Sequence, residues 1–115
     1  MTNLVLLIAC MSLVESGGNT NAWNAKECAM GPLQIRQQAV ADINRHYHVS
    51  FSQADYKNAG LSAWAVLAYG HIYHARTPEQ YAELWQSGPR KRGCKASREY
   101  WRKVQAMMKK LPPAV

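Results

Sequence analysis

Apolar side chains recur at helical intervals in the first segment of the chain, Thr2 to Glu15. Three large apolar residues and one acid are spaced four, three and four positions apart: Leu4, Ile8, Met11 and Glu15. This spacing places them on one face of a helix. The run Ser16-Gly17-Gly18 follows, and glycine is a common residue where a helix ends. The pattern predicts a first helix that carries a carboxylate on its apolar face.

The same kind of periodicity predicts four further helices. They extend from the turn Gly31–Ile35 to about His46, over Leu61–Ala75, from Pro78 (capped by Thr77) to the break at Ser87-Gly88-Pro89, and from the cap Ser97 past Met108. The remaining segments are loops: Asn19–Met30, His48–Gly60 with a short helical turn around Gln53–Lys57, and the basic loop Arg90–Lys95. Strand patterning is absent, except that a short hairpin stays open for Asn19–Leu33. We therefore predict an all-α fold with at most that hairpin.

Composition fits one folded domain that spans residues 1–115. Hydrophobic residues make up 48% and charged residues 18% of the chain, which is typical of a folded protein. The formal net charge is +7, and most of the basic residues lie between Arg90 and Lys110. Such a surface attracts polyanions, and both nucleic acid and the acidic bacterial wall fit that description.

The N-terminal apolar run Leu4–Val14 has some features of a signal peptide. No Lys or Arg precedes it and no small-x-small cleavage site follows it. It is also too short to span a bilayer. We expect neither a cleaved signal peptide nor a transmembrane segment.

The cysteines and histidines do not form a recognisable metal-binding or disulfide pattern. The three cysteines, Cys10, Cys28 and Cys94, are odd in number and widely spaced, so we expect free thiols, with a Cys28–Cys94 bridge as the alternative. His71 and His74 are three residues apart but belong to no H-E-x-x-H motif. We expect no metal and no other cofactor.

The acid Glu15 is the strongest catalytic candidate. Burial on an apolar face disfavours its ionised form and raises its pKa. Its predicted place at the C-terminal end of a helix adds to this effect, because that end carries partial negative charge. A carboxyl group that stays protonated near neutral pH can act as a general acid. The alternative is a glutamate that leans into solvent.

Four short blocks, in this order, resemble the soluble lytic transglycosylase domain. They are Glu15-Ser16-Gly17-Gly18-Asn19, Gly31-Pro32-Leu33-Gln34-Ile35, Trp85-Gln86-Ser87-Gly88-Pro89 and Ser97-Arg98-Glu99-Tyr100-Trp101. They are similar to the family's E-S-G, G-L-M-Q-I and Y-N-A-G motifs and to its tyrosine on the last helix. Together the blocks extend over most of the chain, from Leu4 to about Met108.

The resemblance implies a lysozyme-like helical fold with a saccharide cleft and activity on peptidoglycan. Glu15 would protonate the oxygen between N-acetylmuramic acid and N-acetylglucosamine and then act as a base, giving a 1,6-anhydro product. Gln34 would line the groove, Ser16 would orient the loop or the sugar, and Gly88 would let the backbone approach the sugar. Tyr100 would hydrogen-bond the catalytic glutamate.

The third block departs from the family pattern at two positions. Trp85 and Gln86 stand where tyrosine and asparagine are usual, so position 85 keeps an aromatic face for a sugar and has no hydroxyl. The second block has Pro32 and Leu33 in place of Leu and Met. These departures leave the details of substrate binding open.

A second carboxylate, Glu27, keeps a hydrolytic mechanism open. In a hydrolysing lysozyme a second acid positions water or stabilises the oxocarbenium ion, and the alternative for Glu27 is a solvated loop charge. A rival of another class is a basic helical module that binds nucleic acid through Arg90–Lys110. An inactive wall-binding relic is a third reading. We favour the transglycosylase, a monomer that acts on peptidoglycan at the cell wall, in the periplasm, outside the cell or delivered by a phage, and we expect no nucleic-acid partner.

Overall fold

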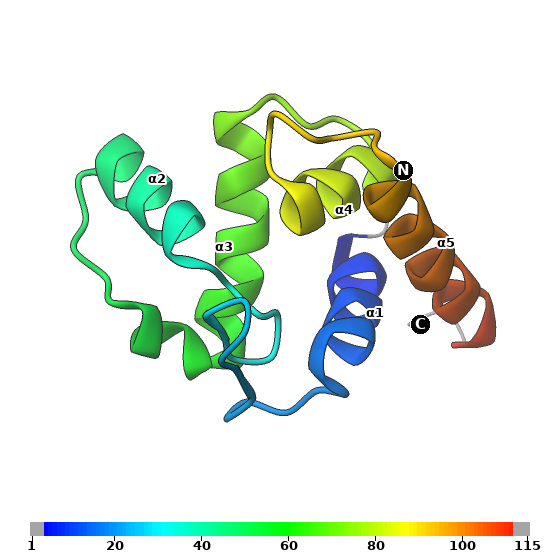
Figure 1. The fold of residues 1–115 in the computed structure, drawn as a ribbon, viewed down its shortest axis with the longest axis horizontal. Coiled ribbons are helices and arrows are strands. Elements are labelled where there is room, and N and C mark those ends of the chain that lie inside the picture. Colours follow the sequence, from blue (N-terminus) through cyan, green and yellow to red (C-terminus); the bar gives the residue numbers. More distant parts are fainter. Residues whose placement is uncertain (1–3, 112–115) are drawn as a thin grey trace.

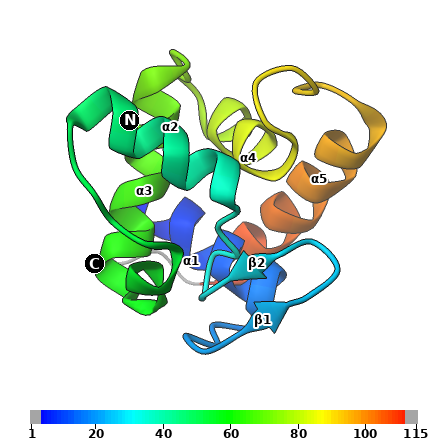
Figure 2. The same ribbon diagram turned by 60° about the vertical axis from the view of Figure 1, so that its left-hand side comes forward.

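The computed structural model describes residues 4–111. Within this range the chain forms five α-helices (Figure 1), a short 3-10 helix and a two-stranded antiparallel sheet (Figure 2). The elements are α1 (Leu4–Ser16), β1 (Trp23–Asn24), β2 (Ala29–Met30), α2 (Gln37–Tyr47), the 3-10 helix η1 (Gln53–Lys57), α3 (Ala59–Ile72), α4 (Pro78–Ser87) and α5 (Lys95–Lys110). The mostly helical class is confirmed, and the hairpin left open for Asn19–Leu33 is present. The predicted helix start at Thr2 lies outside the described residues.

Helix α1 packs against α5 and also contacts α4. Its fully buried side chains are Leu7, Cys10 and Met11. This corrects the predicted buried face, of which Met11 is fully buried while Leu4, Ile8 and Glu15 are half-buried. The centre of the buried face therefore passes beside Glu15, and the carboxylate sits at the border between the core and the surface.

Helices α3 and α4 approach each other closely because one contact point is a glycine. A Cβ atom at Gly70 would overlap the ring of Tyr81. Helix α3 begins two residues earlier than predicted, since the Asn58 side chain caps it by accepting the Leu61 N–H at 2.9 Å. It ends at Ile72, three residues before the predicted end. As predicted, Thr77 caps α4, accepting the Gln80 N–H at 3.2 Å.

The start of α5 corrects a second prediction. Cys94 occupies the capping position, whereas Ser97 lies inside the first turn and is fully buried. The Ser97 hydroxyl donates to the Glu83 carboxylate of α4 at 2.7 Å and accepts the Gly93 N–H at 2.9 Å. Glu83 is itself buried. The serine therefore joins α4 to α5 through a buried acid, and this partner from another helix explains why it does not cap its own.

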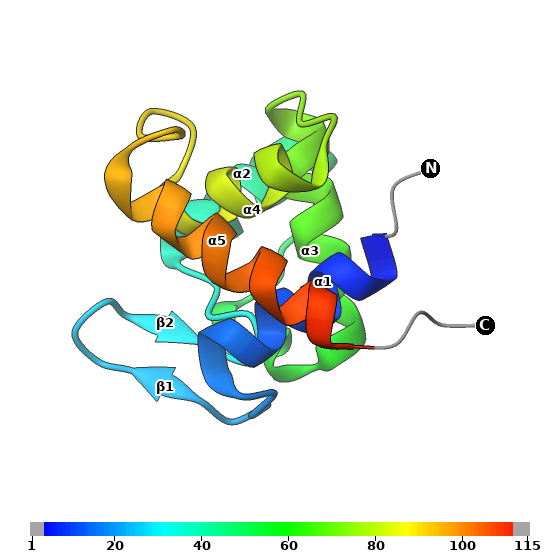
Figure 3. The same cartoon turned by 90° about the vertical axis from the view of Figure 1, so that its right-hand side faces the viewer.

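The hairpin lies beside the C-terminal end of α1 (Figures 2 and 3). Trp23 pairs with Met30 and Asn24 with Ala29. The turn that follows begins at Gly31, where φ is +83° and a Cβ atom would press on the Tyr56 carbonyl. Both conditions require glycine at this position. The hairpin and this turn carry the second sequence block to the end of the helix that bears Glu15.

None of the helices described in residues 4–111 is both long and apolar enough to cross a bilayer.

Candidate active site

Glu15 occupies the last turn of α1 and is half-buried. Within residues 4–111 its carboxylate makes no hydrogen bond and no ion pair. Burial raises the pKa of Glu15 to about 7, while the Arg36 charge opposes that rise and the Glu27 charge adds to it. A carboxyl group with such a pKa is divided between acid and base near neutral pH. It can therefore both donate and accept a proton there.

The chain direction after Glu15 is fixed by its neighbours in sequence. The Ser16 hydroxyl donates to the Pro32 carbonyl at 2.7 Å and so ties the end of α1 to the second block. Gly17 and Gly18 follow with φ of +66° and +80°. Of the two roles expected for Ser16, orienting the loop is the one that this bond supports.

Tyr100 of α5 is 6% exposed and reaches the surroundings of Glu15. Burial raises its pKa well above the usual value, and the negative charge of Glu15 raises it further. However, the Tyr100 hydroxyl has no hydrogen-bond partner in the described part of the chain. The predicted bond from Tyr100 to Glu15 is therefore absent in this structure, although the two groups lie within electrostatic reach.

Arg36, which no sequence motif singled out, connects three parts of the site. It precedes α2, donating from Nη2 to Glu27 Oε1 at 2.9 Å and from Nη1 to the Gln86 carbonyl at 2.7 Å. Its charge lowers the pKa of both Glu15 and Tyr100. The sequence analysis could have singled out Arg36 from its position, because it directly follows the second block and precedes a predicted helix.

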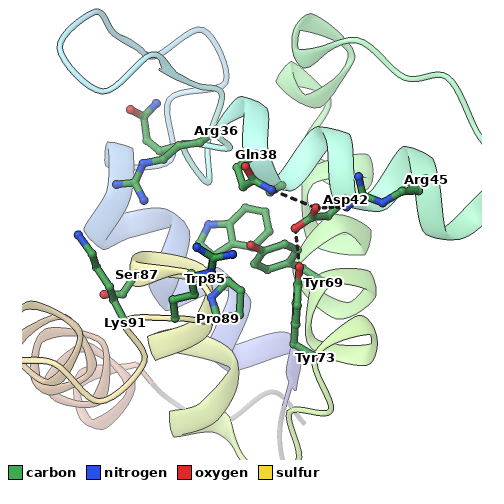
Figure 4. A pocket seen from close by; sticks show the side chains of 14 residues that line it. Arg36, Gln38, Asp42, Arg45, Tyr69, Tyr73, Trp85, Ser87, Pro89 and Lys91 are labelled. Atoms are coloured by element: carbon green, nitrogen blue, oxygen red, sulfur yellow. Dashed lines mark hydrogen bonds and ion pairs between the residues drawn. The ribbon is translucent and has the colours of Figure 1, made fainter.

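A cavity of about 580 Å³ opens between α2, the end of α3 and the loop after α4 (Figure 4). Three predicted binding residues line it, Gln34, Trp85 and Gly88, and so does Arg36. Glu15, Ser16, Gln86 and Tyr100 are not among its lining residues. The structure thus joins the second and third blocks at the cavity, and Arg36 is the residue that connects the cavity to Glu15.

Two of the predicted binding residues, Trp85 and Gln86, make contacts within the protein. Trp85 is 8% exposed, and its indole N–H donates to the Leu33 carbonyl at 2.8 Å. Its ring packs edge-on against Tyr69, with centroids 5.8 Å apart. Little of the indole is left for a sugar, so the tryptophan mainly fastens the third block to the second. Gln86 contributes its carbonyl to Arg36, and its side chain contacts Ser87.

Two positions in the cavity wall have a positive φ. Gln34 has φ of +54° and its side-chain amide donates to the Gly31 carbonyl at 2.9 Å. A non-glycine residue in this region is uncommon and is often found at functional sites. Gly88, with φ of +78°, ends α4 and has open space around it. This glycine therefore leaves its backbone accessible to a ligand.

The carboxylate that lines the cavity, Asp42, was also missed by the sequence analysis. It is 3% exposed and accepts three hydrogen bonds. Oδ1 accepts from Gln38 at 3.1 Å and from Arg45 at 2.7 Å, and Oδ2 accepts from the Tyr73 hydroxyl at 2.7 Å (Figure 4). The signal was an acid beside Ile43 on the apolar face of a predicted helix, the same pattern that identified Glu15.

The remaining candidates do not line the cavity. Glu27 lies in the hairpin loop with its side chain 51% exposed, paired with Arg36. In residues 4–111 no three metal-ligating side chains converge. Cys28 is exposed, Cys94 is half-buried, and the two are not joined.

Comparison of the chain with protein-family models and with curated proteins finds no match. The functional assignment therefore depends on the geometry of the site and on the resemblance of the four sequence blocks.

Proposed function

We propose that this chain is a peptidoglycan-cleaving lytic transglycosylase with a lysozyme-like fold, and that Glu15 is its catalytic acid and base. The observation that carries the proposal is a half-buried glutamate without a hydrogen-bond partner in residues 4–111, with a pKa of about 7. It lies at the end of the first helix, beside the hairpin. The second and third blocks meet in the cavity that Arg36 also lines, and the charge of Arg36 acts on the pKa of Glu15.

The proposed reaction begins with protonated Glu15. Its proton passes to the glycosidic oxygen as the bond from that oxygen to the muramoyl C1 breaks. The C6 hydroxyl of the same muramoyl unit then attacks C1, and the Glu15 carboxylate takes up the hydroxyl proton. The products are a 1,6-anhydromuramoyl end and a free sugar hydroxyl, and Glu15 is protonated again. Burial favours the acid form before the first step, and Arg36 favours the carboxylate between the two steps.

The position of Glu27 supports this single-carboxylate mechanism over hydrolysis. Its side chain is more than half exposed and its carboxylate is bound to Arg36 at 2.9 Å. Asp42, the acid in the cavity wall, has both oxygens occupied by hydrogen bonds. Neither group is placed as a free base for water, as a hydrolysing mechanism with two carboxylates requires.

Mass spectrometry of digested peptidoglycan tests the proposal. We expect fragments with the anhydro mass, and we expect Glu15→Gln to lower the rate by about 10²–10⁴-fold, the usual contribution of a general acid. Glu99→Gln is the matched control, since Glu99 is an exposed acid of α5. Products with ordinary reducing ends would show that the enzyme hydrolyses the bond and does not catalyse transglycosylation. Full activity of Glu15→Gln would contradict the assignment of the acid.

A further inference from the structure

Two histidines from neighbouring helices lie beside each other at the surface. His46 belongs to the last turn of α2 and His71 to the last turn of α3. Their ring centroids are 6.1 Å apart, and the ring planes are inclined by 74°. Both residues are exposed. The pair therefore sits where α2 packs on α3, and neither histidine lines the cavity.

The side chains of this pair have no partner that occupies their ring nitrogens. Within residues 4–111 neither imidazole makes a hydrogen bond or an ion pair. A neutral imidazole has one nitrogen with a free lone pair, which accepts a hydrogen bond or binds a metal ion. The pair therefore offers two unused nitrogen ligands that come from two different helices.

The separation of the rings fits one metal ion between them. Bonds from a metal ion to imidazole nitrogen are about 2.0–2.1 Å long, so two rings on one ion have centroids about 5–6.5 Å apart. The observed 6.1 Å lies within this range. Because both side chains are exposed, they can turn toward a common ion without displacing residues of the core.

We propose that His46 and His71 together bind a divalent transition-metal ion of the class that prefers imidazole, which includes Ni²⁺, Cu²⁺ and Zn²⁺. Water completes the coordination, because no three metal-ligating side chains converge in the described part of the chain. The sequence analysis expected no metal, since His71 belongs to no metal-binding motif. Folding brings it beside a histidine of another helix. The site does not involve Glu15 and is independent of the proposed function.

An ion at this site holds the end of α2 against α3. His46 follows Asp42 by one helical turn, on the same face of α2. Asp42 already accepts a hydrogen bond at 2.7 Å from Tyr73, the residue that ends α3. The ion adds a second link between the same two helices. Because it binds the folded chain and not the unfolded one, it stabilises the fold.

Calorimetric titration of the chain, prepared without a polyhistidine tag, tests the site. The probe is Ni²⁺, which favours thiolates less than Zn²⁺ does and so competes less for the exposed Cys28. His46→Gln and His71→Gln each remove one ligand. His48→Gln and His74→Gln are the matched controls, because these two exposed histidines directly follow the same helices and are outside the pair.

We expect the wild type to bind a single Ni²⁺ and either variant of the pair to bind it about 100-fold more weakly, since two linked ligands strengthen binding by about 10²-fold or more over one. The two control variants keep the wild-type affinity. Ni²⁺ also raises the melting temperature of the wild type and of the controls, and leaves that of the pair variants unchanged.

Three results would overturn the inference. The first is a wild type that does not bind Ni²⁺. The second is wild-type affinity in His46→Gln or in His71→Gln, which would place the ion elsewhere on the chain. The third is an equal loss of affinity in all four variants, which would mean that Ni²⁺ binds single histidines and not the pair.

Discussion

Two carboxylates, Glu15 of α1 and Asp42 of α2, have sharply different surroundings, and only Asp42 lines the cavity. Asp42 is almost fully buried and accepts hydrogen bonds from an amide, a guanidinium and a phenol. Glu15 is half-buried and accepts none within residues 4–111. Its pKa is raised to about 7 by burial. Asp42 is thus the more buried of the two acids and also the one with more hydrogen-bond donors.

Burial alone therefore does not make a reactive acid. Three donors stabilise the charge of Asp42, so this group fixes the positions of Arg45 and Tyr73. Glu15 loses water without gaining donors, so its acid form is favoured. The first arrangement suits a structural role, and the second suits proton transfer. Three predictions test this contrast.

The largest effect concerns stability against pH. Glu15 has a pKa of about 7 when folded and an ordinary value of 4.5. Because the folded pKa is the higher one, its contribution to stability is complete below pH 4.5 and is lost as the pH rises through 7. We expect Glu15→Gln, which does not ionise, to gain up to about 3 kcal/mol over the wild type between pH 4 and 8.

Urea unfolding of both proteins at a series of pH values measures this gain. Glu99→Gln, at an exposed position of α5, serves as the control and should follow the wild type. A constant difference between Glu15→Gln and the wild type across the series would mean that Glu15 titrates at its ordinary pKa.

A middle-sized effect is expected at Asp42. Tyr73→Phe removes the hydroxyl that donates to Asp42 Oδ2 at 2.7 Å. The loss of a hydrogen bond to a buried charge should lower the free energy of unfolding by about 1.5 kcal/mol. Tyr81→Phe is the matched control, since the Tyr81 hydroxyl makes no hydrogen bond within residues 4–111. Equal melting temperatures for the two variants would refute the structural role of the Asp42 network.

The smallest effect is a pair of opposite shifts in the pH dependence of activity. The proposed mechanism needs protonated Glu15, so the rate should fall as the pH rises through about 7. Arg36 lowers the pKa of Glu15 and Glu27 raises it. We therefore expect Arg36→Gln to move the alkaline fall to higher pH and Glu27→Gln to move it to lower pH. The midpoints of the kcat profiles measure both shifts, and shifts in the same direction would contradict this electrostatic account.

Local periodicity predicted most of the helices and the candidate acid. The 3-10 turn at Gln53–Lys57 and the cap at Thr77 were read correctly, since their determinants lie within a few residues. Ser97 was misplaced because its hydroxyl partner, Glu83, is on another helix. The predicted buried face of α1 was shifted by about one residue from the observed one. The reason is that α5, which packs on α1 and selects its buried face, lies far along the chain.

The helical class and the acid at the end of an apolar helix could both be predicted from local sequence patterns. The order of the blocks around that acid is also a property of the sequence. Folding alone brings Arg36 between Glu27 and the end of α4, places Tyr100 within electrostatic reach of Glu15 without a hydrogen bond, and gathers cations around one cavity. The reason is physical: helix formation is governed by neighbours in sequence, whereas pKa and charge compensation depend on groups that only folding brings together.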